Sequence, residues 1–266
     1  MKVKEIKRAL ERLAPPELKE EWDNVGLMVG NLEQDIDKIL VCLDITMENV
    51  NQAISSGADM IISHHPLLFT PLRAVIEQDE TGAIVRKLIQ NNISAYSMHT
   101  NFDKCNGGMN DLLAEKLGLS DVRIFTKEEC TDIFGNTIEA IGRVGYLDTP
   151  MSMDNYVDFV KASLSSTAIR AGGDMERRIE TVALCSGSGG DFIQCAKNAG
   201  ADVFVTADVP HHKGLMAKAL DLNIIDAGHF ETENIICNFL GRFIRNNFPD
   251  VDVEISNSKP FFNSVE

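Results

Sequence analysis

Gly57-Ala58-Asp59-Met60-Ile61-Ile62-Ser63 returns in the second half of the chain as Gly200-Ala201-Asp202-Val203-Phe204-Val205-Thr206. Each copy ends in a short apolar run, which predicts a buried strand. At the same spacing, residues 29–42 align with residues 172–185. His99 aligns with His229 if the first copy contains extra residues within 67–90. A repeat of this length indicates a duplicated domain and not a solenoid.

The length of the chain agrees with two copies of one unit, because 266 residues are enough for roughly two domains of ordinary size. We therefore expect a first α/β repeat over residues 1–125 and a second over residues 126–266, with the C-terminal segment free to pack back on the first. The hydrophobic content of 44% is ample for two packed cores.

Strand and helix patterns alternate along both halves. Short apolar runs predict strands at residues 39–43, 60–62, 93–97, 182–184, 203–205 and 224–226. Amphipathic segments between and around them, such as residues 3–13 and 153–164, predict helices. This alternation predicts an α/β fold of two similar domains, with mostly parallel sheets flanked by helices. In such sheets, ligands bind beyond the carboxyl ends of the strands.

Histidines and carboxylates lie at those strand ends. Two stretches have the form His-x-x-x-carboxylate, namely His99-Thr100-Asn101-Phe102-Asp103 and His229-Phe230-Glu231-Thr232-Glu233, and a third apolar run ends in Ser63-His64-His65-Pro66. Neutral imidazole and carboxylate are ligands of divalent transition metals. Since strand ends meet at one edge of a sheet, the three elements predict a metal centre, most simply a paired one.

Each of these elements also has a structural interpretation. A histidine after a strand is commonly a capped or solvent-facing residue, and Asp103 and Glu233 could cap the helices that follow them. Adjacent histidines on an extended backbone point to opposite sides, so His64 and His65 would serve two metals, or one of them would only support a ligand. The coincidence of all three elements with the internal repeat favours the metal site.

Two further motifs allow more than one interpretation. His212, in the pair His211-His212, is either a substrate-facing group or an ordinary histidine at a helix N-terminus. Ser186-Gly187-Ser188-Gly189-Gly190 stands between a predicted strand and a predicted helix, where backbone N–H groups can cradle a phosphate. It matches neither known glycine-rich nucleotide motif, so a plain strand–helix turn is favoured.

The net charge of −15 and a pI near 4.8 restrict the partners. An acidic surface repels phosphates, so nucleic acid is not expected as a partner. The same surface would repel a small anionic substrate, unless cations bound in the site reverse the local charge.

The six cysteines are scattered without a Cys-x-x-Cys pair, which predicts reduced thiols in a cytoplasmic protein. The N-terminus runs into an amphipathic pattern and not into a signal-peptide core. No apolar run reaches the roughly 18 residues that a membrane span needs, so no membrane association is expected.

Several separated motifs, in order along nearly the whole chain, resemble the NIF-three-like family of type 2 GTP cyclohydrolase homologues. The matching stretches are residues 22–30, 63–66, 99–103, 185–189 and 228–233. The resemblance implies two similar α/β domains, a dinuclear metal site in the cleft between them and ring-shaped homohexamers. By position, it implies that the metal ligands are His64, His65, Asp103, His229 and Glu233.

The residues and the resemblance together predict a divalent-metal-dependent hydrolase. Two ions per chain, among iron, zinc, manganese and nickel, would activate a water molecule for attack on a small anionic substrate. The family resemblance alone implies that this substrate is a nucleotide such as GTP, opened at its purine ring. His99 and His212 are the candidate catalytic groups for proton transfer. The alternative is a non-catalytic ring scaffold or regulatory protein whose metals are structural or sensing.

Overall fold

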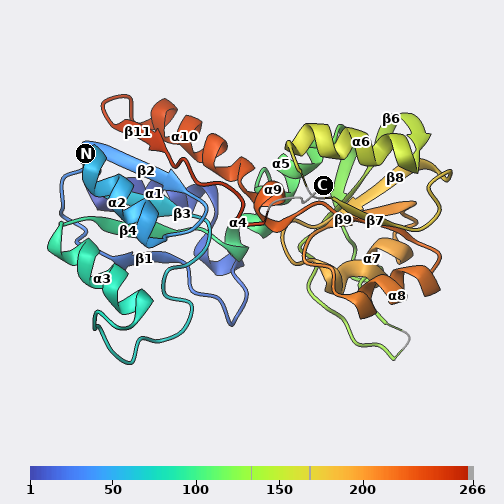
Figure 1. Cartoon of the computed structure of the whole chain (residues 1–266), viewed down its shortest axis with the longest axis horizontal. Helices are drawn as coiled ribbons and strands as arrows, with labels where there is room; N and C mark the ends of the chain where they lie inside the picture. Colours follow the sequence, from blue (N-terminus) through green and yellow to red (C-terminus); the bar gives the residue numbers. More distant parts are fainter. Residues whose placement is uncertain (133, 168, 263–266) are drawn as a thin grey trace. The chain divides into compact units, whose positions relative to one another are not determined.

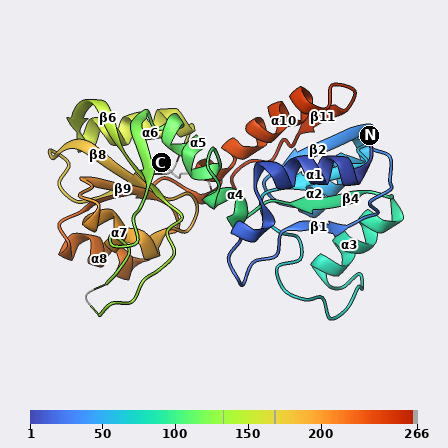
Figure 2. The same cartoon turned by 180° about the vertical axis from the view of Figure 1, so that it is seen from behind.

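The computed structural model describes residues 1–132, 134–167 and 169–262, and the chain divides into two compact units (Figures 1 and 2). Unit 1 consists of Met1–Cys105 together with Ile236–Lys259. Unit 2 consists of the described residues of Asn106–Ile235 together with residues 260–262. The first boundary therefore lies at Cys105 and not at residue 125.

The boundary moves because the last helix and strand of each repeat belong to the other unit. After Asp103, the chain continues through α5 (Met109–Lys116) and β5 (Leu119–Ile124), which are part of unit 2. After Glu233 it continues through α10 (Ile235–Asn247) and β11 (Asp252–Ile255), of which residues from Ile236 onward are part of unit 1. The two repeats thus exchange their C-terminal segments.

The sheet of unit 1 has the order β1-β4-β3-β2-β11. Besides β11, its strands are β1 (Gly26–Val29), β2 (Lys38–Cys42), β3 (Met60–Ser63) and β4 (Ser94–Ser97). All neighbours are parallel except β1, which runs antiparallel to β4 at the edge. The central strands β2 and β3 are buried on both faces, which explains why their sequences are mostly apolar.

The sheet of unit 2 has the order β5-β6-β8-β9-β10-β7. Besides β5, its strands are β6 (Arg143–Ser152), β7 (Arg170–Gly172), β8 (Arg178–Leu184), β9 (Val203–Thr206) and β10 (Asn223–Asp226). Within the described residues only β8–β9 and β9–β10 are parallel pairs. The expectation of a mostly parallel sheet is therefore wrong here, because β5–β6, β6–β8 and β10–β7 all pair antiparallel. Among the described residues, no crossover helix separates β5 from β6.

Four strands of each sheet share one order and one set of directions. In unit 1 these are β1-β4-β3-β2, and in unit 2 they are β7-β10-β9-β8. One side-chain to backbone contact also recurs in both units. The Asp59 carboxylate accepts hydrogen bonds from the backbone N–H groups of Asp37 and Lys38, and the Asp202 carboxylate accepts them from those of Glu180 and Thr181. Two copies of one unit would produce this arrangement.

Helices cover both faces of each sheet. Unit 1 also contains α1 (Val3–Leu13), the 3-10 helix η1 (Pro16–Leu18), α2 (Met47–Ser56), α3 (Glu80–Gln90) and α4 (Thr100–Lys104). Unit 2 also contains α6 (Met153–Leu164), the 3-10 helix η2 (Gly190–Phe192), α7 (Ile193–Asn198), α8 (His211–Ala219) and α9 (His229–Glu233). In unit 2, α5 and α6 pack on one face, and α7 and α8 on the other (Figure 1). No helix in the described part of the chain is long and apolar enough to cross a membrane.

The extra residues of the first copy form the connection between β3 and α3. This connection extends from His64 to Asp79, whereas in unit 2 only residues 207–210 separate β9 from α8. Most of it is without regular structure and exposed. The excursion after Pro66 therefore leaves the shared four-strand order intact.

One pair of cysteines departs from the expected reduced state. Cys130 and Cys195 form a disulfide, with their Cα atoms 4.6 Å apart, and Cys42, Cys105, Cys185 and Cys237 are buried cysteines outside this disulfide. The expectation of six reduced thiols is wrong for this pair, because packing of the β5–β6 connection on α7 joins residues that are 65 positions apart in the sequence.

Candidate metal centre

His64 and His65 follow β3 directly and turn toward the same side. Both of their backbone N–H groups donate to the carbonyl oxygen of Leu43, at 3.2 and 3.0 Å, so the chain leaves the extended path after Ser63. Their ring centroids are 5.0 Å apart. The expectation that the two side chains point to opposite sides is therefore wrong, since it assumed a straight strand.

His99 and Asp103 belong to the short helix α4, which follows β4. His99 is its N-cap residue, and one turn of helix brings the Asp103 carboxylate back toward the strand ends. Asp103 Oδ1 lies 3.6 Å from Nε2 of His64, and both side chains are buried or nearly so. The capping alternative is wrong for Asp103, because the N-cap of α5 is Gly108.

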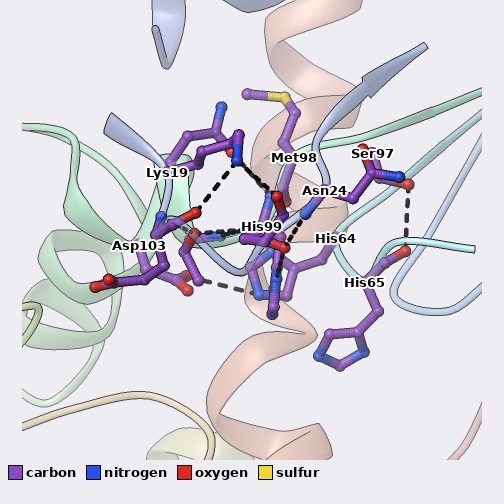
Figure 3. A network of polar contacts seen from close by, with 12 residues as sticks. Lys19, Asn24, His64, His65, Ser97, Met98, His99 and Asp103 are labelled. Atoms are coloured by element: carbon purple, nitrogen blue, oxygen red, sulfur yellow. Dashed lines mark hydrogen bonds and ion pairs between the residues drawn. The ribbon is translucent and has the colours of Figure 1, made fainter. Parts of the chain in front are cut away.

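The three histidines of unit 1 converge. One ring nitrogen from each of His64, His65 and His99 lies within 4.8 Å of the others. Figure 3 shows these side chains and Asp103 gathered beyond the ends of β3 and β4, with His64 linked both to Met98 and to Asp103. Such a group of imidazole and carboxylate donors fits a divalent transition metal.

Asp23 holds the ring of His99 in place. Its Oδ1 lies 2.8 Å from Nδ1 of His99, and its Oδ2 accepts the N–H and the hydroxyl of Thr100, at 3.1 and 2.5 Å. Burial raises the pKa of the Asp23 carboxyl, but the hydrogen bonds from His99 and Thr100 outweigh burial and lower this pKa to about 2. Asp23 is therefore an anion at neutral pH.

Unit 2 places His229 and Glu233 together on α9. His229 Nε2 lies 2.9 Å from Oε2 of Glu233, one helical turn away, and His229 Nδ1 lies 2.6 Å from Oδ2 of Asp208. The loop after β8 approaches them closely: Gly187 has φ +57°, and a Cβ at this position would lie 2.2 Å from Oε1 of Glu233. Glycine is thus required here both for its backbone conformation and for the space.

The histidines of both groups share one mode of support. Each of His64, His65, His99 and His229 places Nδ1 within hydrogen-bond distance of an oxygen, which belongs respectively to Met98, Asp44, Asp23 and Asp208. An Nδ1–H that donates to an oxygen leaves the lone pair of Nε2 for a metal, and metal-binding histidines almost always have such a partner. Among the described residues, His211 and His212 have no such partner.

Within each unit, the structure brings together the candidate ligands that were named from the sequence. The structure groups His64, His65 and Asp103 in unit 1 and His229 with Glu233 in unit 2. His99, expected to transfer protons, lies among the candidate ligands. His212 is exposed in the first turn of α8, and within the described residues no hydrogen bond or ion pair joins it to His229 or Glu233.

Sequence reasoning did not identify the supporting groups Asp23, Asp44 and Asp208. Asp23 could have been found as the carboxylate next to the only tryptophan, in a motif that also resembles the family. In the alignment of the two copies, Asp208 corresponds to His65. At this position the second copy therefore has the carboxylate that contacts His229, whereas the first copy has a candidate metal ligand. Asp44 had no distinguishing pattern.

Comparison with known proteins gives consistent matches over nearly the whole chain. The family model Duf34/NIF3 (NGG1p interacting factor 3) matches residues 1–260. A curated protein of Clostridium perfringens (strain 13 / Type A), named "GTP cyclohydrolase 1 type 2 homolog", is 40% identical over 88% of this chain and 87% of its own length.

Two solved structures share the fold. The Bacillus cereus protein related to NIF3 has a TM-score of 0.91 at 26% identity and covers 100% of this chain and 99% of its own. Reduced HcgD from Methanocaldococcus jannaschii has a TM-score of 0.81 at 30% identity and covers 97% of this chain and 98% of its own.

Proposed function

Because this chain belongs to the Duf34/NIF3 family, we propose that it is a divalent-metal-dependent hydrolase with a dinuclear metal centre. The observation that carries this proposal is the oxygen partner at Nδ1 of His64, His65, His99 and His229, an arrangement that metal-binding histidines almost always have.

The proposed ligands are His64, His65 and Asp103 of unit 1 and His229 and Glu233 of unit 2. His99 joins them in this proposal, because its ring nitrogen lies with those of His64 and His65. Two ions are proposed, since six donor residues exceed the four positions of one tetrahedral site. Imidazole and carboxylate together suit iron, zinc, manganese or nickel.

The residues of the chain would prepare this site for hydrolysis. Bound divalent ions would supply Lewis acidity and lower the pKa of water. Asp23, Asp44 and Asp208 contact the imidazoles at Nδ1, and with metal bound they would keep each ring in the tautomer that has its proton on Nδ1. His212 remains the proposed proton-transfer group outside the ligand set.

A small anionic substrate is proposed, and GTP is the first to test, because curated relatives have the name "GTP cyclohydrolase 1 type 2 homolog". Bound cations would attract an anion that the −15 protein otherwise repels.

Metal-loaded protein should hydrolyse at least one member of a panel of nucleotides, cyclic amides and phosphoesters. We expect chelation and Asp103→Asn to abolish this activity, and His212→Ala to lower turnover without lowering metal content. Product formation is measured by chromatography, and metal content by elemental analysis. Fully loaded protein that hydrolyses no member of the panel would instead favour a non-catalytic ring scaffold or regulator.

We also propose that the chain assembles into a ring-shaped homohexamer, as the family resemblance implies. Light scattering should then give a mass about six times the 29.3 kDa of one chain. A stable monomer at micromolar concentration would contradict this assembly.

A further inference from the structure

Two large aromatic side chains of unit 1 are exposed beside the candidate ligands. Trp22 is 59% exposed and Phe69 is 50% exposed. Their ring centroids are 5.7 Å apart, and they lie 6.1 and 6.4 Å from the ring of His99. The His99 ring in turn lies 5.2 Å from that of His64, so the aromatic pair borders the candidate metal group directly.

The backbone that presents Trp22 is anchored on both sides. Asp23 bonds to His99, the Lys19 ammonium donates to the carbonyl oxygen of Asp23 at 2.6 Å, and the Asn24 side-chain amide donates to the carbonyl oxygen of Leu68 at 2.6 Å. The last bond ties the Trp22 segment to the residue before Phe69. The Asp23 carboxylate thus contacts the candidate ligand His99, and the indole of the preceding residue, Trp22, is exposed beside it. The hydrogen bonds of Asp23 and Asn24 fix the backbone next to Trp22.

The exposure of the two rings leaves aromatic surface available for a ligand. Trp22 and Phe69 are each T-shaped to the His99 ring, at interplanar angles of 72° and 73°, and they are tilted by 51° to each other. Aromatic surface in water is unfavourable, and a planar ring that stacks on it removes both apolar surfaces from solvent. A second protein chain packed on this pair would also cover the bordering imidazoles, which argues for a small occupant of the site itself.

We propose that Trp22 and Phe69 form a stacking wall for a planar unsaturated ring of the substrate, such as a nucleobase. This inference depends on the proposed metal-dependent function, because the wall would bind the ring of a molecule whose reacting group reaches the metal centre. Trp22 and Phe69 are then specificity-determining residues, which select substrates that contain a ring over open-chain anions.

The test compares GMP and CMP with ribose 5-phosphate, which has the sugar phosphate but no base, on zinc-loaded protein. Trp22 is the only tryptophan in the chain, so its fluorescence reports this position alone. We expect both nucleotides to quench this fluorescence and to bind roughly tenfold more tightly than ribose 5-phosphate. An affinity ratio of this size is what the stacking of one base on an aromatic side chain provides.

Substitutions separate the wall from the metal centre. In calorimetry, Trp22→Leu should bind GMP and CMP only as tightly as ribose 5-phosphate, and its zinc content should be unchanged. Trp22→Phe, which keeps an aromatic ring, should retain most of the wild-type affinity for both nucleotides. Ile89→Ala, which removes a side chain that is 63% exposed on α3, is the matched control and should change neither affinity nor zinc content.

Three results would overturn the proposal. One is equal affinity of the wild-type protein for the nucleotides and ribose 5-phosphate, and another is an unchanged nucleotide affinity in Trp22→Leu. The third is a change of mass in light scattering on Trp22→Leu with unchanged nucleotide affinity, which would make the wall an interface between copies of this chain. Failure of the metal-dependent function appears separately, as absence of bound zinc in the wild-type protein.

Discussion

Replacing His64 with alanine is expected to lower the affinity of the protein for divalent metal by more than about 100-fold, a larger loss than removal of a supporting residue produces. His64 is fully buried, its Nδ1 lies 2.8 Å from the carbonyl oxygen of Met98, and its Nε2 faces Asp103. Its replacement by alanine removes a proposed metal ligand. Elemental analysis of protein purified without chelator measures the loss.

The supporting residues should give an intermediate effect. Asp23→Asn keeps the shape of the side chain but removes the charge that holds His99, so metal affinity should fall by roughly 10- to 100-fold. His211→Ala is the matched control, because it removes a histidine whose Nδ1 has no partner among the described residues and should leave metal content unchanged. Full metal occupancy in both His64→Ala and Asp103→Asn would refute the assignment of these ligands.

Gly187→Ala is expected to disrupt metal binding by the proposed ligands His229 and Glu233. The new Cβ would lie 2.2 Å from Oε1 of Glu233 and 3.2 Å from Nε2 of His229, so the carboxylate must swing away from its position beside the imidazole. Metal affinity should fall by roughly 10- to 100-fold, the range for displaced ligand geometry. Metal titration of the purified variant measures this change.

Gly200→Ala is the matched control for Gly187→Ala. Gly200 also has a positive φ, of +78°, but a Cβ there would meet no heavy atom within 4 Å. Both variants should lose about 1–2 kcal/mol of unfolding free energy to backbone strain, and only Gly187→Ala should lose metal affinity. Equal metal affinity in the two variants would show that Gly187 does not control the position of Glu233.

Comparison of the repeat with the structure shows how far the sequence alone can predict the fold. The apolar runs that end at Ser63 and Thr206 predict β3 and β9, and their partners β4 and β10 follow in the same order in both sheets. The pattern did not predict the antiparallel pair of β5 and β6. Alternating strands and helices indicate parallel strands joined through crossover helices, and they carry no information on strands that are joined without a helix.

The sequence by itself determined which side chains are candidate metal ligands, because the repeated His-x-x-x-carboxylate motif and the strand-end histidines are local patterns. Only the tertiary structure revealed which groups support them. Asp23 reaches His99 across 76 positions of the sequence, Asp208 reaches His229 across 21, and Cys130 reaches Cys195 across 65. Periodicity and short motifs report the backbone over a few residues, whereas contacts at these separations depend on how sheets and helices pack. The histidines could therefore be identified from the chain, while the carboxylates that orient them required the fold.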